Sequence, residues 1–237
     1  MKKWIKIAAY SVLSLLIAGI IIFIVWSQFT YKPTEEAYSL VEHNKVDGHL
    51  VFGQKEANTG IIFYQGAKVE VESYSYLGKN LQDHGYFVVM PELPLNLAVL
   101  GTNAADSIIE KYPDIQKWYV AGHSLGGSMI SRYAFQNEKK VDGIIFLASY
   151  PADDFSTKTI PMLSIYGEVD GLATVEEIEN REHLMSKNKT MHLIKGGNHA
   201  NFGMYGEQKR DNASLITPKA QQDETIKAML DWLQSQK

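Results

Sequence analysis

The sequence predicts an α/β fold, a doubly wound and mostly parallel sheet, preceded by one N-terminal transmembrane helix. From residue 49 onward, short runs rich in β-branched and aromatic residues alternate with segments of helical character, and this alternation is typical of parallel strands joined by helices. Several runs are apolar throughout, as expected for strands that helices cover on both faces. A single run of 20 uncharged residues near the N-terminus predicts the transmembrane helix.

The composition fits one folded domain with an appendage. The 237 residues are 45% apolar and 21% charged, which is ordinary for a globular protein with a packed core. The formal net charge of -4 supplies no basic surface for holding phosphates, so we expect no nucleic acid among the partners. The chain has no cysteine, which excludes disulfides, a thiolate nucleophile and cysteine-ligated zinc.

The uncharged run spans residues 7–26. At about 1.5 Å per residue it is long enough to cross a hydrocarbon core of about 30 Å. Lys2, Lys3 and Lys6 precede it and only Lys32 follows closely, so the distribution of positive charge places the N-terminus in the cytoplasm and the rest of the chain outside. We therefore expect a single-pass protein of the cell membrane with an extracellular domain.

A cleaved signal peptide is the alternative for this run. The apolar region of a signal peptide is usually shorter, and its cleavage site has two small residues separated by one position. Here Ser27 has the larger Val25 two positions before it. This favours an uncleaved anchor with Trp4, Trp26 and Tyr31 as interface residues, and a mature, secreted chain beginning near Gln28 would overturn it. A buried core helix is the third alternative, disfavoured because the run is apolar on every face.

The domain organisation follows from these features. We expect a membrane anchor over residues 1–29, a polar tether over 30–46 and a folded domain over 47–237. Within the domain, seven strands are predicted at 49–52, 60–64, 86–90, 118–122, 143–149, 162–167 and 191–195.

Two helices have clear end signals. The helix over 76–83 is followed by Gly85, a residue that often ends helices. The last helix is predicted to begin with Thr217 as N-cap and Pro218 as its first residue. Its apolar positions have helical spacing and predict a face that packs on the sheet: Ile226, Met229, Leu230 and Leu233.

The stretch VAGHSLGG, residues 120–127, contains the pattern G-x-S-x-G around Ser124. Five such residues arise by chance too often to prove a site, but here the serine lies between a predicted strand and a predicted helix. A sharp turn at that junction exposes the serine hydroxyl, and small residues at 122 and 126 let the neighbouring backbone pass. The N-terminus of the following helix adds positive partial charge. The context predicts a catalytic nucleophile.

A nucleophilic serine needs a base, and the base needs an orienting acid. In this kind of site they follow in the order Ser, Asp or Glu, His. Asp170 and His199 each follow the end of a predicted strand, where open α/β sheets build their sites. Glu168 is an alternative acid, and His123 is expected to shape the turn. The other histidines precede the required order or lie in predicted elements or at their ends: His43, His49, His84, His183 and His192.

An oxyanion hole must hold the tetrahedral intermediate. One donor is expected to be the backbone N–H of Leu125, the residue after the nucleophile. The other is expected to be the N–H of Ala67, in the loop that follows the strand over 60–64. The neighbouring Lys68 lies where it would attract an anionic substrate group. Pairing of Lys68 with Glu70 or Glu72 at the surface is an equal alternative.

These residues resemble the α/β-hydrolase superfamily and are similar to its small, single-domain branch of dienelactone hydrolases. The resemblance runs from about residue 48 to the C-terminus and rests on GHSLGG at 122–127, YGEVDGLA at 166–173, GGNHANFG at 196–203 and YQGAKVE at 64–70. Where many members have His-Gly in the last motif, this chain has Gln65 and Gly66. Dienelactone hydrolases use a cysteine nucleophile, and Ser124 stands in that position here.

The resemblance implies hydrolysis of an ester, thioester or amide through an acyl-enzyme, with no metal or organic cofactor. The residues independently predict the same mechanism, in which Ser124 attacks, His199 transfers the proton and Asp170 orients the imidazole. Two alternatives remain open. The same residues would serve acyl transfer to an acceptor other than water, and a hydrolase fold is also compatible with a non-catalytic, membrane-anchored binding protein.

The substrate-binding residues are predicted from the loops. Too few residues separate Ser149 from Ile160 to form a cap domain, so we expect an open site. Residues 91–101 and 200–216 are expected to form its walls, with Phe202, Met204 and Tyr205 either contacting the acyl group or packing the loop onto the fold. An open site at a membrane surface predicts a small-molecule, lipid or envelope-linked acyl substrate.

Overall fold

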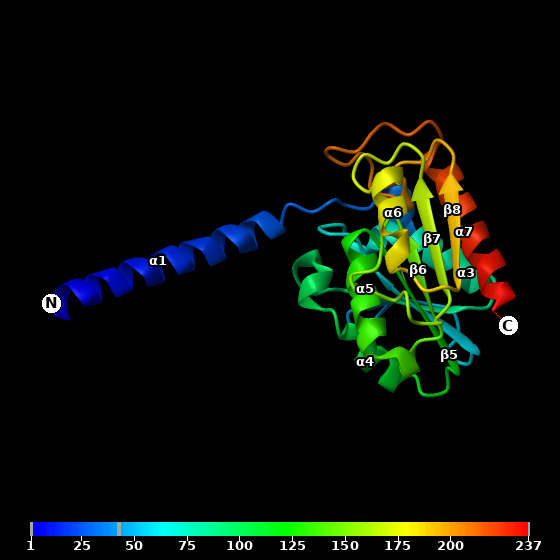
Figure 1. Ribbon diagram of the computed structural model, residues 1–237, viewed down its shortest axis with the longest axis horizontal. Coiled ribbons are helices and arrows are strands. Elements are labelled where there is room, and N and C mark those ends of the chain that lie inside the picture. Colours follow the sequence, from blue (N-terminus) through cyan, green and yellow to red (C-terminus); the bar gives the residue numbers. More distant parts are fainter. Residues whose placement is uncertain (1, 42–43, 237) are drawn as a thin grey trace.

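The computed structural model describes residues 2–41 and 44–236, and His43 lies outside them. In this part of the chain, one eight-stranded sheet lies between two layers of helices (Figure 1). The strand order is β1-β2-β4-β3-β5-β6-β7-β8; β2 pairs antiparallel with both β1 and β4, and the other pairs are parallel. The predicted doubly wound, mostly parallel sheet is confirmed.

The bounds of the strands are β1 Lys45–Val46, β2 His49–Phe52, β3 Thr59–Tyr64, β4 Phe87–Pro91, β5 Lys117–His123, β6 Gly143–Leu147, β7 Met162–Gly167 and β8 Lys189–Ile194. The α-helices are α1 Lys2–Ser27, α2 Glu35–Ser39, α3 Ser75–Asp83, α4 Ala104–Lys111, α5 Leu125–Gln136, α6 Val175–Arg181 and α7 Pro218–Ser235. Short 3₁₀ helices are η1 Val71–Tyr74, η2 Pro94–Asn96, η3 Ala98–Leu100, η4 Glu138–Lys140, η5 Glu182–Leu184 and η6 Ala200–Phe202.

All seven predicted strands are present, each within two residues of its expected ends. The predicted strand over 143–149 stops at Leu147, because Ala148 has a φ of 45° and leaves the sheet. Strand β1 was not predicted, since two exposed residues carry no hydrophobic pattern. The segment between β6 and β7 contains no helix or strand, so the expectation that no large cap interrupts the fold is confirmed.

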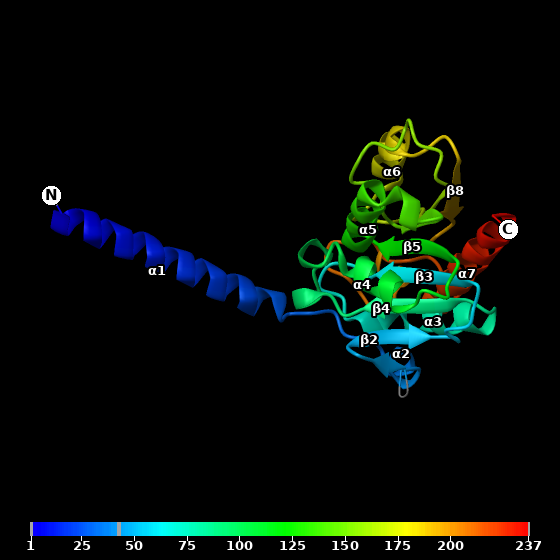
Figure 2. The ribbon, with the colours of Figure 1, turned by 90° about the horizontal axis from the view of Figure 1, so that it is seen from below.

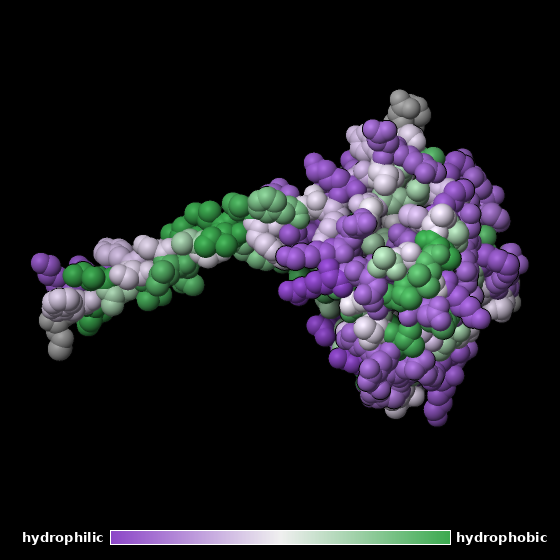
Figure 3. Space-filling view, turned by 90° about the horizontal axis from the view of Figure 1, so that it is seen from above, coloured by the Kyte–Doolittle hydropathy of each residue, from purple (hydrophilic) through white to green (hydrophobic). Residues whose placement is uncertain are grey.

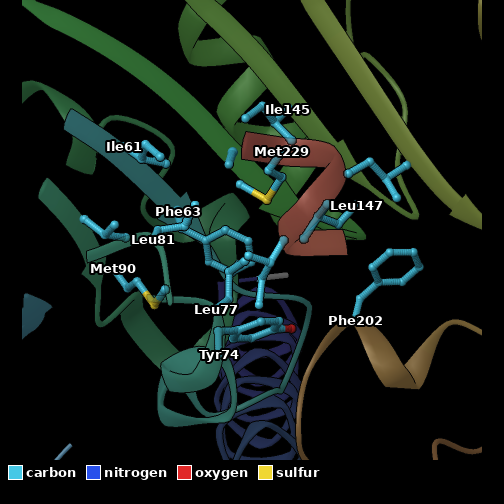
Figure 4. Close-up of a cluster of buried hydrophobic side chains, with 14 of the residues drawn as sticks. Ile61, Phe63, Tyr74, Leu77, Leu81, Met90, Ile145, Leu147, Phe202 and Met229 are labelled. Carbon is cyan, nitrogen blue, oxygen red and sulfur yellow. The ribbon is translucent and has the colours of Figure 1, made fainter. Parts of the chain in front are cut away.

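The central strands are buried on both faces, and their alternating side chains build two separate cores. On β3, Ile61 and Phe63 join the core under α3 and α7, whereas Ile62 and Tyr64 join the core under α4 and α5. Figure 4 shows the first core, in which Met229 of α7 lies over side chains of the strands. Because both faces are covered, these strands are continuously apolar in sequence.

Helix α7 begins as the sequence predicts. The hydroxyl of Thr217 accepts the N–H of Ala220 at 3.2 Å, and Pro218 is the first helical residue. The predicted apolar face is buried on the sheet, where it contains Ile226, Met229, Leu230 and Leu233. This helix therefore covers the core on one face of the sheet.

Helix α1 projects from the domain (Figures 1 and 3), and Figure 3 shows apolar side chains along it. Residues Lys3–Ser27 form a helix long and apolar enough to cross a membrane, and none of its most apolar window is buried within the protein. This excludes a core helix. A signal sequence near an N-terminus can meet the same criteria of length and composition, so this helix is either an anchor or a signal sequence.

The described residues of the segment predicted as a tether over 30–46 are 30–41 and 44–46, and they contact the domain at several points. Ala37 in α2 is fully buried, and its carbonyl oxygen accepts the hydroxyl of Ser75 at 2.5 Å. The backbone of Tyr31 forms a parallel bridge to Val69 beside β3. The folded part therefore begins before residue 47. The sequence did not indicate this, because a few small buried residues such as Ala37 give the segment no helical or strand-like spacing of apolar residues.

Candidate active site

Ser124 lies between β5 and α5 in a strained backbone conformation. Its φ of 52° and ψ of -124° are disfavoured for a residue with a Cβ, at a cost of about 1 to 3 kcal/mol. The turn is held on both sides, because its N–H donates to Leu147 at 3.0 Å and its carbonyl oxygen accepts the hydroxyl of Ser149 at 2.7 Å. This is the strand-turn-helix geometry of a nucleophile elbow.

Close backbone packing explains the glycine at position 126. A methyl group there would lie 2.2 Å from the carbonyl oxygen of Tyr64 and 2.4 Å from that of Gln65. Contacts this short with backbone atoms do not occur in folded proteins. The start of α5 therefore packs directly on the end of β3, which brings Ser124 next to the loop that follows β3.

Gly126→Ala is expected to lower the free energy of unfolding by about 3 kcal/mol or more, since β3 and α5 must separate to admit the methyl group. Urea denaturation followed by circular dichroism measures this. Gly85→Ala is the comparison, because there the methyl group meets nothing within 4 Å and only the φ of 86° opposes it, at about 1 kcal/mol. Equal losses in the two variants would contradict the close packing.

Asp170 and His199 are brought together from loops that follow β7 and β8. Nδ1–H of His199 donates to Asp170 Oδ2 at 2.8 Å, and both side chains are buried. The other carboxylate oxygen accepts the N–H groups of Leu172 at 2.8 Å and Ala173 at 2.7 Å. Three donors thus hold the carboxylate in one orientation. With its proton on Nδ1, the imidazole keeps a free lone pair on Nε2 for a base.

The alternative acid, Glu168, is exposed, and its carboxylate accepts the N–H of Gly196 at 2.8 Å. It caps a turn and does not contact His199. The structure therefore places Asp170, and not Glu168, against the imidazole.

In the described part of the chain, no hydrogen bond joins Ser124 to His199. Among the described residues, neither Ser124 Oγ nor His199 Nε2 has a hydrogen-bond partner. The ring of His199 lies 4.5 Å, centroid to centroid, from that of His123, the residue before the serine. In substrate-free enzymes such catalytic hydrogen bonds are often long and shorten when substrate binds.

His123 is fully buried behind the elbow. The hydroxyl of Tyr74 accepts the N–H of Gly66 at 3.0 Å and bonds Nδ1 of His123 at 2.8 Å. Burial lowers the pKa of His123 well below its ordinary value, and the neighbouring His199 lowers it further. The ring is therefore neutral, and one hydrogen bond joins it to the hydroxyl of Tyr74. Tyr74, which the sequence did not reveal, connects the loop after β3 to the elbow.

The buried His123 predicts a pH dependence of stability. Its pKa is lower in the folded state than the unfolded value of about 6.5, so the unfolded chain binds the additional proton at acidic pH. The stabilisation is complete above that value and is lost as the pH falls through it, by at most about 1.4 kcal/mol per pH unit.

The free energy of unfolding measured from pH 7.5 to 5 is therefore expected to fall less steeply in His123→Gln than in the wild type. His183→Gln is the control, because His183 is exposed. An unchanged slope in His123→Gln would show that the buried ring is not the titrating group.

The two predicted oxyanion donors lie on adjoining segments. Among the described residues, neither the N–H of Ala67 nor that of Leu125 has an acceptor. The loop carrying Ala67 lies against the elbow, since a methyl group at Gly66 would be 2.8 Å from Nδ1 of His123. Both N–H groups are therefore free at the edge where Ser124 lies.

Lys68 makes neither of the expected ion pairs. Among the described residues, Glu72 pairs with Lys45 at 2.7 Å and Glu70 accepts the hydroxyl of Thr30 at 2.7 Å. The ammonium group of Lys68 lies 4.1 Å from the centroid of the Trp26 ring instead. The surface pairing offered for Lys68 is therefore wrong, because the end of α1 reaches this lysine first.

Phe202 and Tyr205 pack the loop onto the fold. Phe202 is fully buried, with its ring 5.8 Å from that of His123, and Tyr205 is 7% exposed beside Tyr31. Met204 is buried as well. The suggestion that Phe202 contacts substrate is wrong, because no part of its side chain reaches the surface; packing is the observed role of all three residues.

Strained residues gather where the central strands end. Among the described residues, most non-glycine residues with positive φ follow β3, β4, β5 or β6: Lys68, Leu95, Asn96, Ser124 and Ala148. The others, Asp47 and Arg210, lie elsewhere in the chain. Such strain persists only where the surrounding structure enforces it, and it concentrates at functional sites. Residues 2–41 and 44–236 contain no group of three or more side chains suited to hold a metal ion.

Comparison with known proteins agrees with the fold. A family model described as the alpha/beta hydrolase family matches residues 60–223, well over half of the chain. The chain therefore belongs to the α/β-hydrolase family. A search of curated protein sequences found no match. The closer similarity to dienelactone hydrolases stays a prediction.

Solved structures show the same fold at low sequence identity. An α/β-hydrolase enzyme from the metagenome of lagoon sediments of Mar Chica, Morocco, is 15% identical, with a TM-score of 0.63 over 82% of this chain and 99% of that one. A monoacylglycerol lipase of Paleococcus ferrophilus is 17% identical, with a TM-score of 0.60 over 80% and 98%. A thermophilic esterase from Thermogutta terrifontis is 10% identical, with a TM-score of 0.61 over 79% and 93%.

Proposed function

We propose that this protein is a serine hydrolase that cleaves a carboxylic ester through an acyl-enzyme on Ser124. The observation that carries the proposal is the buried pair of His199 and Asp170, joined at 2.8 Å beside a serine held at a φ of 52°. If Ser124 and His199 served only the structure, the strain at the serine would be unnecessary. The second imidazole nitrogen would also have no reason to lack a partner within the protein.

In this mechanism, Ser124 Oγ attacks the carbonyl carbon while its proton passes to Nε2 of His199. Asp170 stabilises the imidazolium that forms and keeps Nδ1–H pointed at itself. The N–H groups of Ala67 and Leu125 stabilise the negative charge that develops on the carbonyl oxygen. Collapse of the intermediate breaks the bond to the alcohol oxygen, which takes the proton from His199. Water then attacks the acyl-enzyme by the same route and releases the acid.

Thioesters and amides are the further acyl substrates that this machinery would accept. Transfer of the acyl group to an acceptor other than water would use the same first half-reaction. Release of free acid in water, without any added acceptor, distinguishes hydrolysis from transfer.

Helix α1 is the proposed membrane anchor, with the N-terminus in the cytoplasm and the catalytic domain outside. Support comes from its length, its exposure and the lysines that precede it. The mass of the mature chain tests this, because an anchor leaves α1 attached and a cleaved signal sequence leaves a chain beginning near Gln28.

The activity is tested on the full chain in detergent with a fluorophosphonate probe, which phosphonylates an activated serine. We expect one adduct, located on the peptide that contains Ser124, and release of p-nitrophenol from short-chain p-nitrophenyl esters. A folded protein that takes up no probe and hydrolyses no ester would instead be a membrane-anchored binding protein.

A further inference from the structure

Helix α1 ends against the loop that carries a proposed oxyanion donor. The ring of Trp26 lies 4.1 Å from the ammonium group of Lys68, and Ser27 is fully buried. Helix α1 also contacts η2, and Figure 2 shows the loop after β4 beside the end of α1. Because Ala67 directly precedes Lys68, the active-site edge of the sheet faces the end of the helix.

The segment that joins α1 to the domain, residues 28–34, is tied to two loops of the site. On one side, the N–H of Tyr31 donates to Lys68 at 2.7 Å, and Tyr31 accepts the N–H of Glu70 at 2.9 Å. On the other side, the N–H of Thr34 donates to Met204 at 2.8 Å, in the loop that follows His199. These bonds fix the direction in which α1 leaves the domain.

Exposed apolar side chains lie on the segments near this junction. Phe29 is 69% exposed, and Val99 and Leu100 in η3 are 56% and 48% exposed. Helix η3 contacts α5, whose first turn follows Ser124, and it also contacts η2 beside α1. We call these three residues the junction patch. Apolar groups next to the end of a membrane-spanning helix are stable when they enter the interfacial region of the bilayer.

We propose that the substrate is an acyl ester of a lipid in the bilayer, which enters the site from the membrane surface. This inference rests on the proposed function and on α1 remaining attached. Tryptophan at the end of a spanning helix lies at the level of the lipid head groups. Lys68, in contact with Trp26, lies at that level and attracts anionic head groups. The Cα atom of Ala67 is about 3.8 Å from that of Lys68. This proximity holds Ala67 near the depth of lipid ester carbonyls.

The test separates anchoring from orientation. A flexible insert of about 20 glycine and serine residues between Gln28 and Phe29 has an average span of about 25 Å. It keeps the domain attached to α1 but removes the fixed orientation of the domain relative to the helix. The same insert between Lys139 and Lys140, which are exposed at the opposite edge of the sheet, is the control. Each full-length protein is reconstituted in vesicles of dioleoylphosphatidylglycerol carrying dioleoylglycerol.

Two rates are measured for each protein: release of oleate from the vesicles, and hydrolysis of p-nitrophenyl acetate, which is water-soluble. The insert after Gln28 is expected to lower oleate release about tenfold and to change p-nitrophenyl acetate hydrolysis by less than about twofold. The control insert is expected to change neither rate.

Equal oleate release by the wild type and by the protein with the insert after Gln28 would overturn the inference. Wild-type protein that hydrolyses p-nitrophenyl acetate but releases no oleate would also overturn it, while the proposed function would stand. Failure of the wild type on both substrates, with no fluorophosphonate adduct, would overturn the proposed function itself.

Discussion

Replacing Ser124 by alanine is expected to lower kcat for ester hydrolysis by about 10⁴-fold or more. The variant keeps the oxyanion donors and the buried His199–Asp170 pair, but no atom remains that forms the acyl-enzyme. The residual rate would come from water attack assisted by the oxyanion hole alone. Steady-state hydrolysis of p-nitrophenyl butyrate by wild type and variant measures the loss.

The matched control is Ser107→Ala, an exposed serine on α4. It is expected to retain full activity and to react with the fluorophosphonate probe, whereas Ser124→Ala is expected not to react. The melting temperatures of both variants should stay close to that of the wild type or above it, because alanine at 124 removes no buried hydrogen bond of the hydroxyl. Activity retained in Ser124→Ala would remove the serine from the mechanism.

The second large effect is expected for Asp170→Asn, which should lower kcat by about 10⁴-fold. The asparagine keeps the size of the side chain, and its carbonyl oxygen can still accept the N–H groups of Leu172 and Ala173. Its NH₂ group then faces His199 and favours the imidazole tautomer with the proton on Nε2. That tautomer has no lone pair for the proton of Ser124, and the imidazolium loses its counter-charge. The same ester assay measures the loss.

Glu168→Gln is the matched control because Glu168 follows the same strand and accepts a backbone N–H of its own. Its kcat is expected to stay within a few-fold of the wild type. The opposite pattern, a mild Asp170→Asn and an inactive Glu168→Gln, would assign the orienting role to Glu168.

Much of the fold was predictable because it depends on local patterns. Apolar runs identified seven strands, and Thr217 with Pro218 identified the start of α7. The candidate site was predictable for the same reason, since the strand-to-helix turn around Ser124 needs small residues at fixed spacing. The positions of Asp170 and His199 follow from the rule that parallel strands place their carboxyl ends along one edge.

Other features join residues that lie far apart along the chain. The bond from Tyr74 to His123 spans 49 positions, and the contact of Trp26 with Lys68 spans a polar segment whose pattern suggested a free tether. The burial of Phe202 is equally invisible in sequence, because an aromatic residue in a loop serves either a core or a binding surface. Each of these depends on which segments the sheet brings together.

The sequence by itself determined the class of fold, the elbow and the order of Ser124, Asp170 and His199, because periodicity, glycine spacing and chain order are properties of neighbouring residues. Tertiary structure alone decided that Asp170 rather than Glu168 contacts His199, and that α1 ends at the edge where the site lies. These are outcomes of packing between distant segments, and no local pattern encodes the distance between them.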